Sequence, residues 1–166
     1  MCGIIGISSN KSVSANIVSS LKKLEYRGYD SAGIATISKG IINEIKSEGR
    51  VDRLEKNFDL KNLSGNIGIG HVRWATHGIP NSVNAHPHSS DNVSVVHNGI
   101  IENSTLLKKY LVNKGHIFKS QTDTEVIVHL ITENLKITEI HEAITKTLKQ
   151  LHGSFALGII LKICQI

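Results

Sequence analysis

The sequence predicts a single α+β domain in which mostly antiparallel sheets are layered against helices. Short apolar runs, which are typical of buried strands, occur in two groups, one in each half of the chain. Amphipathic patterns typical of helices accompany each group. No internal repeat or linker-like segment interrupts the 166 residues, of which 40% are apolar, enough for one hydrophobic core. We therefore expect residues 1–166 to form one domain.

The chain begins with a pattern that predicts a strand and then a helix. Residues 4–7 form an apolar run. Apolar residues spaced by three or four positions follow, which is the periodicity of one helix face; they are Val13, Ile17, Leu21 and Leu24. Asn10 or Ser12 precedes this stripe, so either residue is expected to cap the helix.

A hairpin and a second buried strand are expected next. Residues 33–46 alternate as two strands around a turn that contains Gly40. Residues 67–72 form an apolar run that predicts a buried strand. Gly68 and Gly70 within this run predict the close approach of a neighbouring backbone.

The second half begins with a long loop and ends in helices and a strand. Residues 73–91 show no periodicity, and loops of this length inside compact domains are usually functional. A strand is expected at residues 93–97. The remaining patterns predict three helices and a final strand, at residues 104–114, 123–135, 139–151 and 154–163. Thr122 and Glu125 are spaced as a capping box for the second helix.

The composition argues against several classes of protein. No apolar run is long enough to span a membrane, and the N-terminus lacks the features of a signal peptide. Two cysteines, Cys2 and Cys164, are too few for a disulfide framework, so we expect a cytoplasmic protein. The net charge is +5, but the lysines are scattered and only 4% of residues are aromatic. We therefore expect no nucleic-acid partner and no membrane association.

Cys2 is the first candidate for chemistry. A small residue at position two is the type that permits removal of Met1, which would leave a thiol and a free α-amine on one residue. The α-amine has a reference pKa of about 7.7–8.0, so part of it is a neutral base at cytosolic pH. It can then accept the proton of the thiol and activate it as a nucleophile. An ordinary small residue would fit the same position, so both interpretations stay open.

Asn98 and Gly99 form the second candidate. A side-chain amide next to a glycine at the end of a strand can supply two N–H donors in adjacent positions, which is how an oxyanion hole is built. A plain Asn-Gly turn is the commoner meaning of this dipeptide. No second apolar strand follows immediately, which weakens the hairpin interpretation without excluding it.

Two charged residues could recognise a substrate. Arg73 follows a buried strand and could hold a carboxylate through two hydrogen bonds, although a structural ion pair fits equally well. Asp123 could bind an ammonium group or could simply cap a helix. A cation and an anion on separate elements would together recognise the backbone of an α-amino acid.

Nine histidines are present, and several lie close together in the sequence. His71 and His97 lie in the two expected strands, and His77, His86 and His88 lie in the loop between them. Their spacing does not match zinc sites and no cysteine pair accompanies them, so we expect no metal. A Cys-His-Asn triad of Cys2, one of these histidines and Asn98 is an alternative mechanism that spacing alone leaves open.

Five segments in order resemble class II glutamine amidotransferase domains, which are N-terminal-nucleophile hydrolases. Three of them are CGIIG at residues 2–6, HVRWATHG at 71–78 and HNGIIEN at 97–103. Two more, EYRGYDSAG at 25–33 and TDTEV at 122–126, are similar to the glutaminase domains of the glutamine–fructose-6-phosphate aminotransferase family. The resemblance extends from Cys2 to about Gly158 and so covers nearly the whole chain.

The resemblance implies a role for each matched residue. Cys2 without Met1 would attack the side-chain amide of glutamine through a γ-glutamyl thioester, with its own α-amine as the base, which favours this mechanism over the histidine triad. Asn98 and Gly99 match the oxyanion hole of the family. The residues implied in glutamine binding are Arg73 for the α-carboxylate, Asp123 for the α-ammonium, Trp74, Thr76 and His77 in a mobile loop, and Arg27 near the nucleophile.

The resemblance also implies a fold and a function. The fold would be a four-layer α/β/β/α sandwich, and its second sheet is expected to lack the last strands because the domains of the family continue for longer. The activity would be hydrolysis of glutamine to glutamate and ammonia, with no cofactor. The sugar isomerase domains of the family are not expected in this chain. The alternatives are an inactive or binding-only remnant, or a glutaminase subunit that needs a separate sugar isomerase partner.

Overall fold

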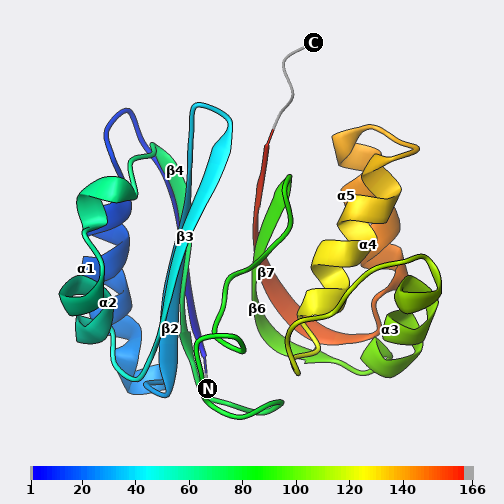
Figure 1. Ribbon diagram of the computed structural model, residues 1–166, viewed down its shortest axis with the longest axis horizontal. Coiled ribbons are helices and arrows are strands. Elements are labelled where there is room, and N and C mark those ends of the chain that lie inside the picture. The colour runs from blue at the N-terminus through cyan, green and yellow to red at the C-terminus, as the bar shows by residue number, and fades with distance from the viewer. Residues whose placement is uncertain (1, 163–166) are drawn as a thin grey trace.

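A computed structural model describes residues 2–162, without the side chains of Asn57 and Lys61. The chain forms four layers, as expected: helices, a sheet, a second sheet and helices (Figure 1). The two sheets pack face to face, and each has its helices on its outer face. Within the described residues, no helix is both long enough and apolar enough to cross a membrane. The expected end of the last strand at residue 163, and Cys164, lie outside these residues.

The first sheet has the strand order β1-β4-β2-β3, and all its neighbours are antiparallel. Its strands are β1 (Gly3–Ser8), β2 (Ser31–Ser38), β3 (Ile41–Glu48) and β4 (Ile67–Arg73). The predicted hairpin is β2 and β3, and its two turn residues Lys39 and Gly40 have φ angles of 49° and 72°. Positive φ at both turn positions matches the right-handed twist of the strands. The pairing of Gly3 with Val72 brings Cys2 to the C-terminal end of β4.

Helices α1 (Ser14–Leu24) and α2 (Asp52–Asn57) and the short turns η1 (Glu25–Arg27) and η2 (Leu60–Asn62) accompany this sheet. Helix α1 buries its predicted apolar stripe against the strands. The predicted cap by Asn10 or Ser12 is wrong. The helix begins after Val13, which makes no side-chain cap, and the N–H of Val13 donates to the carbonyl of Gly65 at 2.9 Å.

Gly68 and Gly70 were predicted to allow close approach of a neighbouring backbone. The nearest neighbour of both positions is instead the side chain of Ile17. A Cβ on Gly70 would lie 2.5 Å from a methyl group of Ile17, and one on Gly68 would lie 2.7 Å from another. The backbone carbonyl of Ala35 comes within 2.9 Å of the second position. The two glycines therefore allow α1 to pack directly onto β4.

The second sheet has the order β5-β6-β7 and is also antiparallel. Its strands are β5 (His88–Ser89), β6 (Val93–Ile101) and β7 (Gly153–Leu161). Strand β6 is longer than expected and does not end at Asn98, because β7 pairs with it along its whole length, from Val93 to Ile101. Asn98 and Gly99 therefore lie within a paired strand.

Three helices cover the outer face of the second sheet, namely α3 (Ser104–Asn113), α4 (Glu125–Leu135) and α5 (Ile140–Gln150). The predicted capping box at the start of α4 is wrong. The carboxylate of Glu125 accepts the N–H groups of Lys119 and Ser120 at 2.9 and 2.7 Å, while the hydroxyl of Thr122 contacts His88. Glu125 therefore holds the segment before α4 through Lys119 and Ser120 and does not form a capping box with Thr122.

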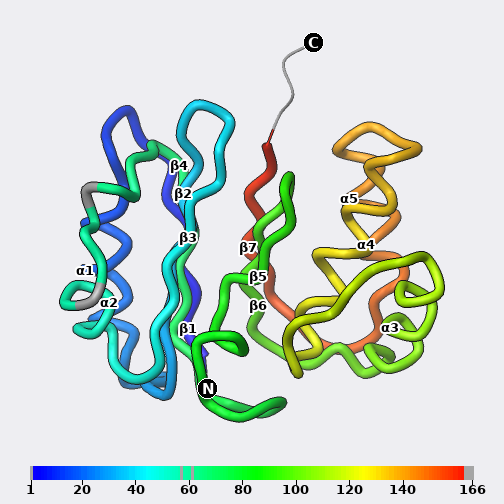
Figure 2. The backbone as a smooth tube through the Cα atoms, viewed as in Figure 1, coloured from blue at the N-terminus to red at the C-terminus, as the bar shows by residue number. Residues whose placement is uncertain are grey.

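The core has three parts. One lies between α1 and the first sheet, and a second lies between the other sheet and its helices. A smaller apolar layer joins the two sheets, formed by Ala35, Ile69, Val96 and Ile160. The long loop after β4 leads from the first sheet to the second, as the tube in Figure 2 shows. Strands β1, β4 and β6 thus come together at one end of the interface between the sheets.

Candidate functional site

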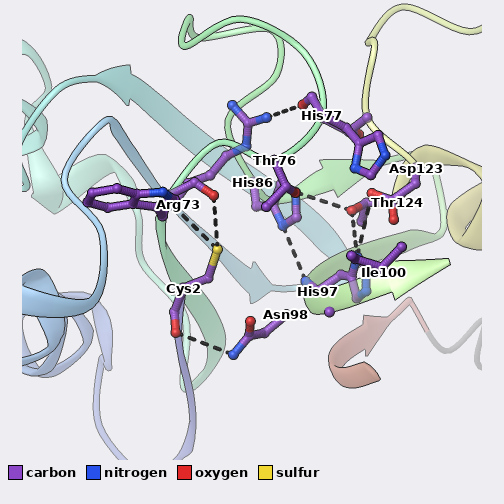
Figure 3. Close-up of a pocket in the computed structure, with 13 residues that line it drawn as sticks. Cys2, Arg73, Thr76, His77, His86, His97, Asn98, Ile100, Asp123 and Thr124 are labelled. Carbon is purple, nitrogen blue, oxygen red and sulfur yellow. Dashed lines mark hydrogen bonds and ion pairs between the residues drawn. The ribbon is translucent and has the colours of Figure 1, made fainter. Parts of the chain in front are cut away.

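A pocket of about 260 Å³ lies where the two sheets and the long loop meet (Figure 3). All the residues predicted for the site, apart from Arg27, line it: Cys2, Arg73, Trp74, Thr76, His77, Asn98, Gly99 and Asp123. Five further residues complete the lining: His86, His97, Ile100, Thr122 and Thr124. The two histidines were considered from the sequence only as members of the alternative triad, and the other three residues were not predicted for the site. The volume lies near the lower end of the range for ligand pockets, about 300–1,000 Å³ for drug-sized molecules, so it suits a small metabolite.

Cys2 lies just before β1 and contacts the backbone of Trp74. Its sulfur accepts the N–H of Trp74 at 3.4 Å, and its thiol can donate to the carbonyl of the same residue at 3.6 Å. The side chain is half-buried and opens into the pocket. Because an N–H donor stabilises a thiolate, this contact suits a nucleophile. Among residues 2–162, the hydrogen bonds of this sulfur go to Trp74 and none goes to a histidine.

The carbonyl of Cys2 is held by two side chains. Nε of Arg27, in the turn after α1, donates to it at 3.0 Å. Nδ2 of Asn98 donates to it from β6 at 3.3 Å. Arg27 is therefore adjacent to Cys2 but outside the lining of the pocket.

Asn98 and Gly99 reach the pocket because β6 passes close to β7. Gly99 has a φ of 140°, and a Cβ at this position would lie 2.2 Å from the carbonyl oxygen of Ser154. A side chain is thus excluded by both backbone conformation and space. Asn98 and Gly99 line the same pocket as Cys2, and Figure 3 shows the side chain of Asn98 next to Cys2. This arrangement can stabilise an oxyanion.

Arg73 is a buried cation that holds the loop after β4 and lines the pocket. Its Nη2 donates to the carbonyls of His77 and Gly78, which holds the loop after β4. Its Nη1 is buried and has no hydrogen-bond partner among the described residues. Burial lowers the pKa of the guanidinium below its usual range, but arginine stays protonated in proteins. The unpaired Nη1 is therefore a place for a ligand carboxylate.

Asp123 supplies the opposite charge. Its Oδ2 accepts the N–H of Ile101 at 2.8 Å, and Oδ1 lies 4.0 Å from Nδ1 of His97. The side chain is buried but lines the pocket. It is not part of α4, which begins two residues later, so its helix-capping interpretation is not supported. The oxygen Oδ1 can accept a hydrogen bond from a ligand ammonium group.

The loop that follows Arg73 is held by Asp30, the residue directly before β2. The carboxylate of Asp30 accepts the N–H of Ala75, and the N–H of Asp30 donates to the carbonyl of Arg73 at 3.2 Å. Trp74 is 48% exposed, and its ring meets that of Tyr29 edge-on, with 5.6 Å between the ring centroids. Trp74, Thr76 and His77 therefore form one wall of the pocket next to solvent.

The family model described as "Glutamine amidotransferase domain" matches residues 71–163. The chain belongs to the glutamine amidotransferase domain family. It is similar to the glutamine–fructose-6-phosphate aminotransferases [isomerizing] of Mesorhizobium japonicum, with 53% identity over 98% of the chain, and of Pyrococcus horikoshii, with 55% identity over 96%. The chain spans 27% of the length of each of these relatives.

Solved structures agree with this assignment. The glutamine phosphoribosylpyrophosphate amidotransferase of B. subtilis, complexed with ADP and GMP, superposes with a TM-score of 0.85 and 30% identity, over 98% of this chain and 35% of that one. A glutamine aminotransferase class-II domain protein from Silicibacter pomeroyi has a TM-score of 0.67 at 12% identity, over 98% of this chain and 73% of that one, and so agrees in fold alone. The expected sandwich of the N-terminal-nucleophile type is confirmed.

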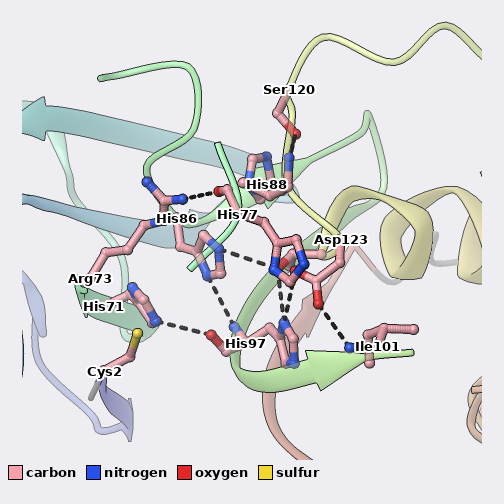
Figure 4. A network of polar contacts seen from close by, with 12 residues as sticks. Cys2, His71, Arg73, His77, His86, His88, His97, Ile101, Ser120 and Asp123 are labelled. Atoms are coloured by element: carbon pink, nitrogen blue, oxygen red, sulfur yellow. Dashed lines mark hydrogen bonds and ion pairs between the residues drawn. The ribbon is translucent and has the colours of Figure 1, made fainter. Parts of the chain in front are cut away.

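The amidotransferase domain also contains a cluster of buried histidines at the pocket, two of which, His86 and His97, line it (Figure 4). Its members are His71, His86, His88 and His97, which come from β4, the long loop, β5 and β6. Burial lowers the pKa of His71 and of His88 to about 3 and holds that of His86 well below its usual range. The rings of His71, His86 and His88 are therefore neutral at physiological pH. The high histidine content was the only signal of this cluster in the sequence. Among the described residues, no group of three His, Cys, Asp or Glu side chains is arranged to bind a metal ion.

Proposed function

We propose that this domain hydrolyses the side-chain amide of glutamine to glutamate and ammonia, with Cys2 as the nucleophile. One observation carries the proposal. A single pocket combines the sulfur of Cys2, the oxyanion donors of β6, a buried guanidinium and a carboxylate. Nη1 of the guanidinium has no hydrogen-bond partner among the described residues, and Oδ1 of the carboxylate lies 4.0 Å from the ring of His97. A free α-amino acid with a reactive side-chain carbonyl complements each of these groups.

Recognition of glutamine begins with its two charged groups. Nη1 of Arg73 would donate to the α-carboxylate, and Oδ1 of Asp123 would accept from the α-ammonium. Hydrogen bonds between ionised groups are about twice as strong as those between neutral groups. Fixing both ends of the amino-acid backbone would direct the amide side chain toward Cys2. Trp74, Thr76 and His77 would close the solvent side.

The chemical steps follow from the groups around Cys2. After removal of Met1, the α-amine would take the thiol proton, and the thiolate would attack the amide carbon. The negative oxygen that forms would accept hydrogen bonds from Nδ2 of Asn98 and the N–H of Gly99. Collapse of this intermediate breaks the C–N bond, and the protonated α-amine gives its proton to the leaving nitrogen, which departs as ammonia. Water, deprotonated by the same amine, would then hydrolyse the thioester to glutamate and restore the thiol.

We assign Arg27 to holding the nucleophile and not to binding glutamine. Its hydrogen bond to the carbonyl of Cys2 supports this assignment, as does its position outside the pocket lining. Asn98 would then have two tasks, since it holds the same carbonyl and faces the reacting atoms.

The test is ammonia release from glutamine, combined with the intact mass of the chain before and after treatment with a glutamine analogue that carries an electrophilic ketone. We expect loss of Met1, one adduct on Cys2 and measurable turnover. Cys2→Ala and a variant that keeps a residue before Cys2 should both abolish turnover. Cys164→Ala is the matched control and should keep the adduct. A chain that binds glutamine, retains Met1 and forms no adduct would instead support a binding-only remnant.

The ammonia acceptor is a further part of the proposal. The relatives named above are fructose-6-phosphate aminotransferases, and this chain spans 27% of their length. We propose that ammonia passes to a sugar-phosphate site outside residues 1–166, in a separate sugar isomerase partner or a continuation of the chain, and that the protein works in the cytoplasm. Addition of a sugar isomerase subunit should couple ammonia release to fructose 6-phosphate. No coupling would count against a separate partner.

A further inference from the structure

The backbone of His97 is bound by side chains on one side of β6. Strand β5 pairs with Ser94 and Val95 and does not extend to His97. In place of a strand, two imidazoles occupy this edge. The N–H of His97 donates to Nδ1 of His86 at 3.2 Å, and its carbonyl accepts from Nε2 of His71 at 3.0 Å (Figure 4). His97 directly precedes Asn98 and Gly99 in the sequence.

These contacts define which ring nitrogens carry a proton. Nδ1 of His86 accepts an N–H, so the proton of its neutral ring is on Nε2, which donates to the hydroxyl of Thr124 at 3.2 Å. Nε2 of His71 faces a carbonyl, so it must carry the proton. The hydroxyl of Thr124 lies 2.9 Å from Nδ1 of His97, which extends the chain of hydrogen bonds to the ring of that residue.

Burial keeps the two imidazoles neutral. His71 is 0% exposed and His86 is 5% exposed. Their rings are stacked, with 4.2 Å between the centroids. Protonation of both rings would place two positive charges at this distance and so disfavour the stacking. Nδ1 of His71 is buried without a hydrogen-bond partner among the described residues, as fits an unprotonated nitrogen. A proton on Nδ1 of His86 would instead point at the N–H of His97 and break that contact.

The same contacts connect the two halves of the site. His71 belongs to β4, where it pairs with Ile4 of β1, two residues after Cys2. Its hydrogen bond to His97 joins the strand pair that carries the nucleophile to the strand that carries the oxyanion donors. The distance between sulfur and oxyanion hole therefore depends on this ring.

We propose that His71 and His86, each with its proton on Nε2, are positioning residues that hold His97 and thereby set Asn98 and Gly99 against Cys2. The proposal rests on the glutaminase activity proposed above. An oxyanion hole stabilises charge that develops in the transition state, so its displacement lowers kcat more than it changes substrate binding. Glutamine is bound by Arg73 and Asp123, which neither imidazole contacts through a hydrogen bond.

The first experiment compares two substitutions of the same residue. His86→Phe keeps a ring but removes the acceptor, whereas His86→Asn can place its amide oxygen near the position of Nδ1. For the phenylalanine variant we expect kcat for glutamine to fall by about 10- to 100-fold, the size of effect that a misplacement of about 1 Å can have, with little change in KM. The asparagine variant should recover most of the loss. His71→Gln, which keeps a donor, should likewise exceed His71→Leu in kcat.

His88→Phe is the matched control. His88 is as buried as His86 and lies 5.0 Å from it between ring centroids, but its hydrogen bond goes to Thr122 and not to His97. Its kcat should stay within about threefold of the wild type, since nothing that holds the oxyanion hole is removed. Equal losses of kcat in His86→Phe, His86→Asn and His88→Phe would overturn the proposal. A change confined to KM would also overturn it.

The second experiment needs no variant to be active. Nitrogen NMR of the wild-type chain with ¹⁵N-labelled histidine, with signals assigned through His86→Asn and His71→Gln, should show Nδ1 of both rings without a proton at pH 7. A proton on Nδ1 of His86 would refute the proposal directly. Absence of ammonia release by the wild type would refute the proposed function instead, while the NMR result still reports on the positions of the ring protons.

Discussion

Gly99 offers a sharp test of how β6 approaches β7. In Gly99→Ala the new Cβ would lie 2.2 Å from the carbonyl oxygen of Ser154 and 2.7 Å from Cα of Phe155, at a φ of 140°. Both neighbours are backbone atoms, so no side chain can rotate away to relieve the overlap. Gly115, after α3, is a matched control because it also has a positive φ, of 91°, but nothing lies within 4 Å of its Cβ position.

The two glycines separate backbone strain from steric overlap. Gly115→Ala should lower the free energy of unfolding by about 1–2 kcal/mol, the cost of a left-handed conformation for an L-residue. For Gly99→Ala, strain adds about 1–3 kcal/mol. Overlap adds about 1–3 kcal/mol more. The expected total of about 2–6 kcal/mol is a large part of the stability of a typical domain, about 5–15 kcal/mol.

Urea unfolding followed by circular dichroism measures both differences on the same chain. The kcat of folded Gly99→Ala should also fall, because β6 can relieve the overlap only by moving the oxyanion donors. If Gly99→Ala were no less stable than Gly115→Ala, the close approach of the two strands would be refuted.

Three further predictions concern charge. Arg73→Met should raise the KM for glutamine by about 10- to 100-fold, since a hydrogen bond to a charged group contributes about 1.5–3 kcal/mol. It should leave hydrolysis of 4-aminobutyramide, which lacks the α-carboxylate, unchanged, and equal losses on both amides would argue against carboxylate binding. Asp123→Asn keeps an acceptor for Ile101 and should raise the KM for glutamine but not for glutaramate, which lacks the ammonium group; a parallel rise would contradict the assignment. The free energy of unfolding should decrease as pH falls from about 6.5 to 5, by up to about 1.4 kcal/mol per pH unit for each buried histidine. The reason is that His71 and His88 have a folded pKa of about 3, so only the unfolded chain takes up protons in this window. A constant urea midpoint at pH 7, 6 and 5 would contradict this.

Local patterns predicted most elements of the fold. The apolar stripe from Val13 to Leu24 and the turn at Gly40 depend on residues near each other in the sequence, and both are present as expected. The predicted caps of α1 and α4 were wrong because they, too, were inferred from neighbouring residues alone. Glu125 has the spacing of a capping box with Thr122 but bonds instead to Lys119 and Ser120, because the segment before α4 is drawn toward the second sheet.

Much of the site was also predictable, because its residues stand in short motifs. Cys2, Arg73, Asn98 and Asp123 each carry a chemical group that suggests its role, and the fold brings all four to one pocket. Arg27 was predicted to bind substrate, yet its hydrogen bond goes to the carbonyl of Cys2. A side chain of that length can reach several neighbours, so its partner depends on where the fold places the start of β1.

The sequence by itself determined the order of strands and helices and the chemical groups of the site, because helix and strand periodicity and motif spacing are local properties. Only the tertiary structure decided the partners of His97. Its N–H, carbonyl and ring bond to His86, His71 and Thr124, which come from a loop, another sheet and the segment before a helix. Contacts among residues 11 to 27 positions apart depend on how the two sheets pack, and no local pattern encodes that packing.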